Sequence, residues 1–175
     1  MATGSAGLFG RKLEKPKSNI GDLSIFEGDR FLEWLNPEIV LVGLNISRGD
    51  IKYPLANFHD VRSEATDYKI RYALKDTRFW GGYMTDIIKD FSEKESGRMM
   101  SYLRMNPAFE KDNVGIFEGE LKDLGCSDPT IIAFGNDAHS ILLRNFKDKY
   151  RIFKIPHYAN YTNKEKYREQ VSEIL

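Results

Sequence analysis

Four polar residues with the chemistry of a binding or catalytic site lie in or just after hydrophobic runs at separate points of the chain: Asn45, Asp86, Asn136 and His157. An amide donates and accepts hydrogen bonds, a carboxylate accepts them, and an imidazole gains or loses a proton near neutral pH. Because these residues are far apart in the sequence, only the fold can bring them together.

Strands and helices alternate along the chain in a way that predicts how these residues are positioned. Apolar runs indicate strands at residues 39–42, 83–88, 130–134 and 150–155, and helical spacing of apolar residues indicates helices at 117–124, 137–146 and 164–175. This alternation predicts an α/β fold, a three-layer sandwich with a mostly parallel central sheet of about four strands. Ligands bind such sheets beyond the carboxyl ends of the strands. We therefore expect the four polar residues to converge at that edge.

The rest of the chain has weaker patterns. Residues 23–35 favour a short helix or turn, which the Asn-Pro pair at positions 36 and 37 then breaks. Residues 46–78 are expected to be mostly loop or short helix. Small polar residues at the start predict a flexible N-terminal segment over residues 1–17, followed by a single domain over residues 18–175.

The composition is that of an ordinary globular protein, with 175 residues of which 41% are hydrophobic and 30% charged. The 26 basic and 26 acidic residues cancel, whereas tight non-specific binding to nucleic acid usually needs a basic excess. A local excess of eight basic over three acidic residues occupies positions 144–169. This stretch is expected to be a solvated helix surface with paired charges, or else a basic face that meets phosphates.

Several functional classes leave no trace in the sequence. Glycine motifs for phosphates or dinucleotides, the serine-hydrolase elbow and zinc-ligand spacings are missing, so we expect no cofactor and no metal. The single cysteine, Cys126, indicates a reducing compartment, and no apolar run is long enough to cross a membrane. The sequence therefore predicts a cytoplasmic monomer with no membrane partner.

Each candidate residue also has an ordinary structural explanation. Asn45 could cap a following helix, and Gly135 with Asn136 could form a normal turn between a strand and a helix. His157, next to a proline, could be a loop histidine with no chemical role. Asp86 is different, because a buried carboxylate is costly unless donors or a ligand satisfy it.

At these positions the sequence resembles the uracil-DNA glycosylase superfamily. The run Val-Leu-Val-Gly-Leu-Asn-Ile-Ser at residues 40–47 resembles the family's first signature, a strand that ends in a glycine turn. The run Ile-Pro-His-Tyr-Ala-Asn at residues 155–160 resembles the second, a strand that ends in His-Pro-Ser. Residues 82–89 and 128–138 resemble segments of the thermostable, iron-sulfur branch. The likeness covers about residues 37–162, with the pieces in the family's order.

The resemblance implies a role for each matching residue. Asn45 would orient the attacking water, and His157 would stabilise the negative charge on the departing base. The base would be held by Gly43, Leu44, Phe58 and Asp86, with Phe58 as the stacking ring and Asp86 reading the edge of the base. DNA would be contacted by Gly135, Asn136, Tyr158, Asn160 and Tyr161, the last near the point where a wedge residue enters the duplex. Cleaving an N-glycosidic bond needs such a donor, a positioned water and a base removed from the stack.

The sequence departs from the family pattern at several points. Ile46 stands where the first signature has proline, and Tyr158 and Ala159 replace Pro-Ser of the second, which removes a hydroxyl that would bind a DNA phosphate. Asp86 replaces the Asn that reads uracil, and a carboxylate cannot donate to uracil O4 but can accept from an exocyclic amine. The four cysteines of the iron-sulfur branch are missing. These changes favour a relative with a different base, a different ligand or a lost activity.

Three hypotheses follow. The first is a glycosylase-like hydrolase that cleaves an N-glycosidic bond and releases a base from DNA. The alternative is a non-catalytic protein on the same fold that binds a nucleobase or nucleic acid. In both, the partner is DNA or a nucleobase-containing ligand. The third is an α/β domain in which the motifs are only turns and caps.

Overall fold

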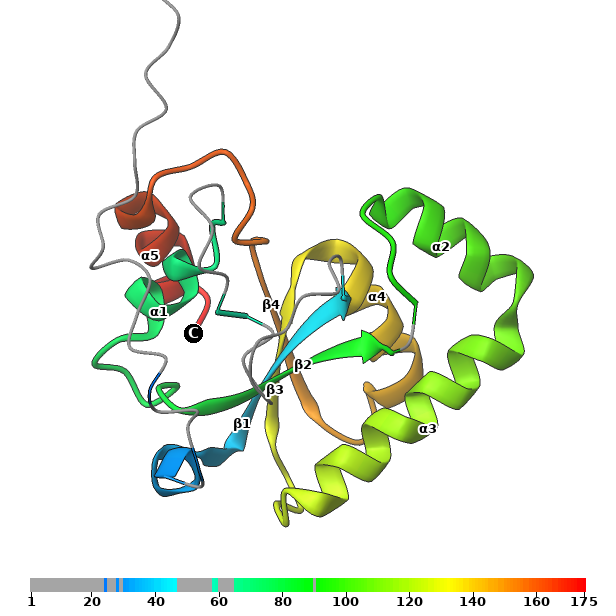
Figure 1. Cartoon of the computed structure of the whole chain (residues 1–175), viewed down its shortest axis with the longest axis horizontal. Helices are drawn as coiled ribbons and strands as arrows, with labels where there is room; N and C mark the ends of the chain where they lie inside the picture. The colour runs from blue at the N-terminus through cyan, green and yellow to red at the C-terminus, as the bar shows by residue number, and fades with distance from the viewer. Residues whose placement is uncertain (1–23, 25–27, 29, 47–57, 60–64, 90) are drawn as a thin grey trace, which may run out of the picture.

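The computed structural model of the chain describes residues 24, 28, 30–46, 58–59, 65–89 and 91–175, so the predicted flexible segment 1–17 lies outside the described residues. The described residues form a sheet of four parallel strands in the order β2-β1-β3-β4 (Figure 1). The strands are β1 (Asn36–Asn45), β2 (Gly82–Ile88), β3 (Thr130–Phe134) and β4 (Arg151–Ile155). Each lies where a hydrophobic run predicts a strand.

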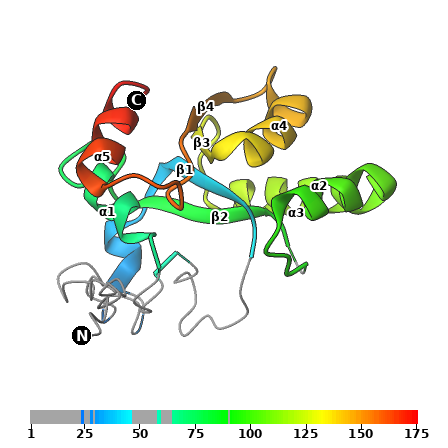
Figure 2. The same cartoon turned by 90° about the horizontal axis from the view of Figure 1, so that it is seen from above.

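Helices lie on both sides of the sheet, so the molecule has three layers (Figures 1 and 2). On one side are α1 (Tyr68–Leu74) and α5 (Lys164–Ser172). On the other are α2 (Ser96–Met105), α3 (Pro107–Asp123) and α4 (Gly135–Phe146). A short 3-10 helix, Arg30–Trp34, precedes β1. The predicted α/β fold with a parallel central sheet of four strands is confirmed.

Alternate residues of β1 contribute to two separate cores, one on each face of the sheet. Val40 and Val42 pack with side chains of α2, α3 and α4, whereas Ile39 and Leu41 pack with side chains of α1 and α5. Burial on both faces is expected of a central strand in a parallel sheet. This burial fixes the rotation of β1 about its own axis. It therefore also determines on which face of the sheet each residue near the carboxyl end of β1 lies.

β1 begins earlier than the run at residues 39–42 predicts. Asn36 already pairs with Gly82 of β2, and its main-chain N–H donates to Gly81 O at 2.8 Å. The register shifts between Asn36 and Val40, and Pro37 falls in this irregular part. A proline is tolerated at such a point because its missing N–H breaks no ladder hydrogen bond. The 3-10 helix ends at Trp34, so the predicted short helix or turn does stop before the Asn-Pro pair, and the pair itself begins β1.

The helices on the second face are longer than the sequence pattern indicates. The pattern at residues 117–124 covers only the end of α3, and no pattern predicts α2. Their burial is sparse, with Met99 and Leu103 as the buried residues of α2, and glycines interrupt both helices. Packing of these few side chains on the core outweighs the weak local propensity. α1 falls within residues 46–78, where a loop or short helix is expected.

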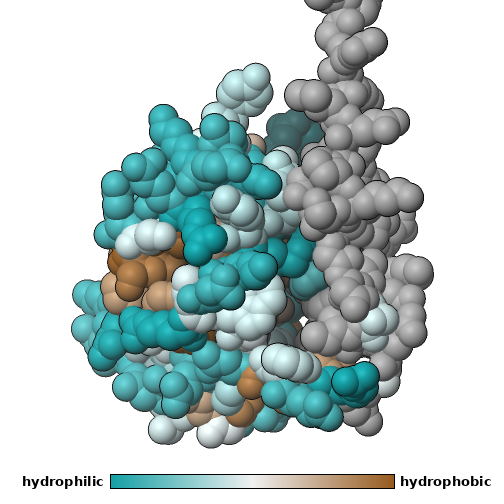
Figure 3. Space-filling model, turned by 90° about the vertical axis from the view of Figure 1, so that its left-hand side faces the viewer, coloured by the Kyte–Doolittle hydropathy of each residue, from teal (hydrophilic) through white to brown (hydrophobic). Residues whose placement is uncertain are grey.

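Outside the grey atoms, the side of the molecule formed by α1 and α5 is largely hydrophilic, with small apolar areas between the polar side chains (Figure 3). In α5, Tyr167 and Val171 are buried while charged side chains face outward, as predicted for a charged amphipathic helix. Within the ranges that the structure describes, no helix is both long and apolar enough to span a bilayer.

Gly81→Ala is expected to destabilise the fold. Gly81 has a φ of +79°, and a Cβ there would lie 2.1 Å from the main-chain oxygen of Trp34. Moving a side chain relieves neither the left-handed backbone nor this contact, so we expect urea denaturation to show a loss of about 2–4 kcal/mol in unfolding free energy. Gly119→Ala is the control, because its Cβ meets nothing within 4 Å on α3. It should gain about 0.5–1 kcal/mol, and similar losses at both positions would contradict the structure.

Candidate functional site

The end of β1 leaves room for a carboxylate on the face of the sheet that α1 and α5 cover. Gly43 pairs in register with Asp86 of β2. A Cβ on Gly43 would lie 2.2 Å from Asp86 Oδ1 and 3.1 Å from Phe58 Cζ. The carboxylate and the ring, each in a side chain that is 6% exposed, therefore occupy the space that a larger residue would fill. Three of the predicted base-binding residues are grouped at this point.

Phe58 belongs to a group of three rings, Phe58, Phe134 and Tyr158, that we call the aromatic cluster. The centroid of the Phe58 ring lies 5.8 Å from that of Phe134 and 6.3 Å from that of Tyr158, and Phe134 and Tyr158 meet edge-on at 5.4 Å. Tyr158 also stacks on His157, with centroids 4.4 Å apart and planes at 24°. The aromatic cluster thus connects the surroundings of Asp86 to His157. Tyr158, which the sequence predicts as a DNA contact, packs its ring against Phe134 and His157.

His157 follows β4, and its side chain packs against Gly135 at the end of β3. A Cβ on Gly135, where φ is +82°, would lie 3.4 Å from His157 Cβ. The ring nitrogen Nδ1 accepts a hydrogen bond from the Ala159 N–H at 3.1 Å, which assigns the proton of the neutral ring to Nε2. Burial lowers the pKa of His157 below its usual value, so the ring is neutral at pH 7. His157 is therefore a neutral hydrogen-bond donor through Nε2.

The amide of Asn45 is fixed by main-chain oxygens. Its Nδ2 donates to Glu93 O at 2.9 Å, to Phe91 O at 3.1 Å and to Ile46 O at 3.3 Å. These contacts hold the loop that follows β2 against the end of β1. They use the nitrogen of the amide, and none of the hydrogen bonds between described residues uses Oδ1. Asn45 thus has a structural role, and its oxygen is the end that can accept from a water.

The strand register places Asn45, Asp86 and His157 at the same edge of the sheet. Asn45 is the last residue of β1, and His157 comes two residues after Ile155 at the end of β4, with β3 between the two strands. Neighbouring parallel strands lie about 4.8 Å apart, so β1 and β4 are separated by roughly 10 Å. Asp86 lies one strand away on the other side of β1, level with Gly43. The hollow that the sequence predicts between these residues stays a prediction.

The other predicted residues fall in different surroundings. Leu44 packs with the core on the α3 and α4 side, so it can reach the aromatic cluster only through its main chain. Asn136 Oδ1 accepts from Lys154 Nζ at 3.0 Å near the surface. Asn160 and Tyr161 are exposed in the turn after His157, and the Tyr161 side chain is fully accessible to an outside partner.

A second polar group lies on the opposite face of β2. Thr85 Oγ1 donates to Glu120 Oε2 at 2.9 Å, and Lys89 Nζ lies 2.5 Å from Thr85 Oγ1 and 2.9 Å from Glu120 Oε1. Burial, and then the charge of Glu120, raises the pKa of Tyr83 beside them. These groups satisfy one another between β2 and α3. They are therefore part of the packing of α3 and do not join Asp86.

Lys69 is a residue near the site that has no sequence signal. Its side chain in α1 is 4% exposed, and its Nζ donates to the main-chain oxygen of Asn160 at 3.0 Å. Lysines are almost always exposed, so a lysine in a weakly patterned segment gives no hint of burial. The contact ties α1 to the turn that follows His157.

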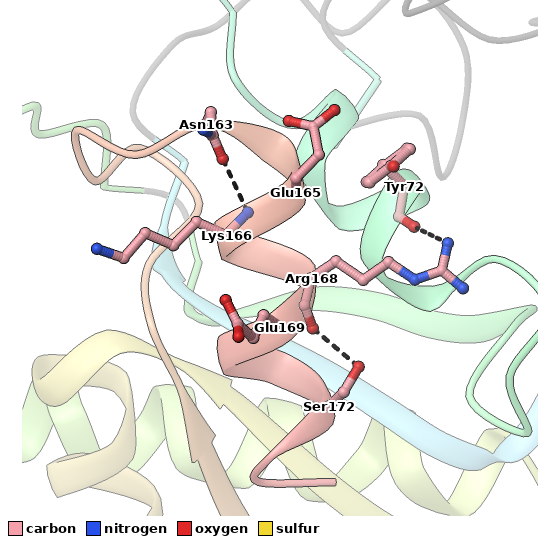
Figure 4. A pocket seen from close by; sticks show the side chains of 7 residues that line it. All are labelled: Tyr72, Asn163, Glu165, Lys166, Arg168, Glu169 and Ser172. Carbon is pink, nitrogen blue, oxygen red and sulfur yellow. Dashed lines mark hydrogen bonds between the residues drawn. The ribbon is translucent and has the colours of Figure 1, made fainter.

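A shallow groove between α1 and α5 contains none of the predicted residues (Figure 4). Its lining mixes basic, acidic and uncharged side chains: Lys166, Arg168, Glu165, Glu169, Tyr72, Asn163 and Ser172. Arg168 donates to the main-chain oxygens of Tyr72 and Lys75, both at 3.4 Å, and so holds the two helices together. Among the described residues, no group of three or more His, Cys, Asp or Glu is placed to hold a metal ion.

Acid is expected to destabilise the protein through His59. Burial, and then the charge of Arg71, lowers the pKa of His59 to about 4. In the unfolded chain the pKa is about 6.5, so the unfolded state takes up the proton first as the pH falls. The stability that depends on neutral His59 is complete above pH 6.5 and is lost between pH 6.5 and 4, an effect of about 3 kcal/mol.

Thermal unfolding between pH 7.5 and 4 measures this effect. The melting temperature should fall less steeply in His59→Gln than in the wild type, because glutamine does not titrate. His139→Gln is the matched control, since His139 lies on α4 and its pKa is lowered by a smaller burial and by Lys154. Parallel curves for the wild type and His59→Gln would contradict the expectation.

Comparisons with known proteins add no relative. No protein-family model matches the chain, and neither a curated protein nor a solved structure is significantly similar to it.

Proposed function

We propose that this protein is a uracil-DNA glycosylase-like hydrolase that cleaves an N-glycosidic bond and releases a base from DNA. The observation that carries the proposal is His157, a neutral donor held at the sheet edge where Asn45 ends β1 and Asp86 lies over Gly43. The likeness of residues 40–47 and 155–160 to the two family signatures supports the same assignment.

In the proposed reaction, the bond between C1′ of the sugar and the base nitrogen breaks, and its electron pair leaves with the base. Nε2–H of His157 donates to the charge that builds on the base, and such a donor acts most strongly when it is already in place. Because the ring is neutral, it stabilises the leaving base without first protonating it. A water oriented by Asn45 Oδ1 adds to C1′, and the proton that it loses ends on the released base.

Asp86 is proposed to select the base. A carboxylate only accepts hydrogen bonds, so it favours a base edge that presents an exocyclic amino group over the O4 of uracil. Phe58, beside Asp86, provides the aromatic surface that a base removed from its stack requires. The residues thus fit base release, with a specificity that differs from that of uracil excision.

His157→Ala is expected to lower the rate of base release about 10²–10³-fold, because a preorganised donor is lost. The assay measures free base from single-stranded and duplex oligonucleotides that contain uracil, hypoxanthine or a mismatched base. Asn45→Ala should also lower release. His139→Ala is the control, since this histidine lies outside the site on α4, and it should leave the rate unchanged.

The wild type distinguishes the hypotheses. Release of a base supports the hydrolase. Binding to DNA or to a free base without release favours the non-catalytic alternative, and it requires that His157→Ala weakens binding. If neither ligand raises the melting temperature, the motifs are only turns and caps.

Asp86→Asn is expected to shift selectivity toward uracil by about tenfold to a hundredfold, the size of one good base-edge contact. Asparagine has the shape of aspartate, so it fits the space over Gly43 and adds an N–H donor. Asp128→Asn, an exposed site ahead of β3, is the control and should not change the preference. Unchanged selectivity in Asp86→Asn would exclude a base-reading role.

A further inference from the structure

The 157–162 turn, defined as residues 157–162 after β4, carries His157 and is organised by its own hydrogen bonds. Asn160 N–H donates to His157 O at 3.0 Å, and Ala159 N–H donates to His157 Nδ1 at 3.1 Å. Thr162 N–H donates to Asn160 O at 2.8 Å. The position of the Asn160 main chain therefore sets both the path of the turn and the hydrogen bond that fixes the tautomer of His157.

Lys69 contacts the turn at this central point. Its Nζ donates to Asn160 O, the same oxygen that accepts from Thr162. The side chain is 4% exposed, and an ammonium group is kept out of water only where hydrogen bonds compensate for the lost hydration. A charge-assisted bond of this kind is stronger than one between neutral groups. Lys69 thus adds a charge-assisted hydrogen bond to the weaker hydrogen bonds that the turn makes within itself.

The position of α1, which carries Lys69, is fixed by packing and by polar contacts. Ile70, Ala73 and Leu74 bury one side of the helix in the core, and Arg71 lies 3.4 Å from Asp67 in an ion pair within the helix. Arg168 of α5 holds the other end of α1 through main-chain oxygens. Apolar packing and the contacts of Arg71 and Arg168 therefore fix α1, and from this fixed helix Lys69 reaches the 157–162 turn.

We propose that Lys69 is a positioning residue that holds the 157–162 turn and, through it, the imidazole of His157 in the tautomer with its proton on Nε2. This inference rests on the proposed function for its catalytic consequence, and on the geometry of the turn for its structural one. Lys69 acts through His157 and does not touch the reacting atoms.

Lys69→Met removes the donor and keeps the length of the side chain, and Lys69→Arg restores a cation. Lys69→Gln is a second removal variant for use if Lys69→Met does not fold. Arg168→Met is the matched control, because it removes a cation that also holds α1 through main-chain oxygens but does not reach the turn. Thermal unfolding reports how much each change loosens the fold.

The first measurement is the tautomer of His157 by ¹⁵N NMR of histidine-labelled protein, with His157→Gln to assign the signal. The wild type, Lys69→Arg and Arg168→Met should hold the Nε2–H tautomer. Lys69→Met should give a mixture of the two tautomers. An unchanged tautomer in Lys69→Met, or an equal disturbance in Arg168→Met, would overturn the proposal.

The second measurement is base release. Lys69→Met should lower kcat about tenfold to a hundredfold with little change in KM, because misplacing a catalytic group by about 1 Å costs rate in this range. Lys69→Arg should recover most of the loss. Equal kcat values in Lys69→Met and Arg168→Met would overturn the catalytic part. If the wild type releases no base, the proposed function fails while the tautomer measurement still decides the role of Lys69.

Discussion

Two glycines at the ends of the central strands determine what the candidate site contains. Gly43 lies two residues before the end of β1 and Gly135 follows β3, and a polar residue from an outer strand, or from just after one, lies against each glycine. Asp86 of β2 lies over Gly43, and His157 after β4 packs against Gly135. Because central parallel strands are covered on both faces, a larger residue at Gly43 would displace the carboxylate of Asp86. A Cβ at Gly135 would come only into ordinary van der Waals contact with His157, and there the positive φ is what favours glycine. The polar side chains thus come from the outer strands, and glycines of the central strands lie against them.

Main-chain groups fix several polar side chains at this edge of the sheet. The amide of Asn45 donates to the carbonyls of the loop after β2, the imidazole of His157 accepts from Ala159, and Lys69 donates to Asn160 O. A side chain already held by the main chain loses little further entropy when a substrate binds, which is the condition for a preorganised site. The same bonds couple the loop after β2 and the 157–162 turn to the chemistry, so neither segment can change without moving a candidate catalytic group.

The sequence predicts the sheet well because central parallel strands are continuous apolar runs, and these runs place Asn45, Asp86 and His157 near one edge. It cannot predict what depends on contacts between distant segments. Two of the carbonyl partners of Asn45 lie 46 and 48 residues away, and Lys69 lies 91 residues from Asn160. The placement of Leu44 could have been found, because alternation along β1 puts it on the opposite face from Gly43.

The contacts of the basic stretch at residues 144–169 determine how much electrostatic attraction it could give to DNA. In the basic stretch of residues 144–169, Arg144 pairs with Glu110 and Lys149 pairs with Glu118, both acids of α3. Lys164 and Arg168 lie over the ring of Tyr72. In this part of the stretch the charges are paired, as the sequence favours, and a paired basic side chain releases fewer counterions when it meets a phosphate backbone.

If the protein acts as the proposed glycosylase, a chain with no net basic excess would draw most of its binding free energy from the base itself. Extracting a base from a duplex costs a few kcal/mol, which stacking and edge hydrogen bonds have to offset. In this chain those contacts would come from Phe58 and Asp86, and both are buried around Gly43, where a base can enter only if the residues covering them move aside. In the proposed reaction, entry of the base would therefore require movement around Gly43, while the hydrogen bonds of the 157–162 turn keep His157 in place.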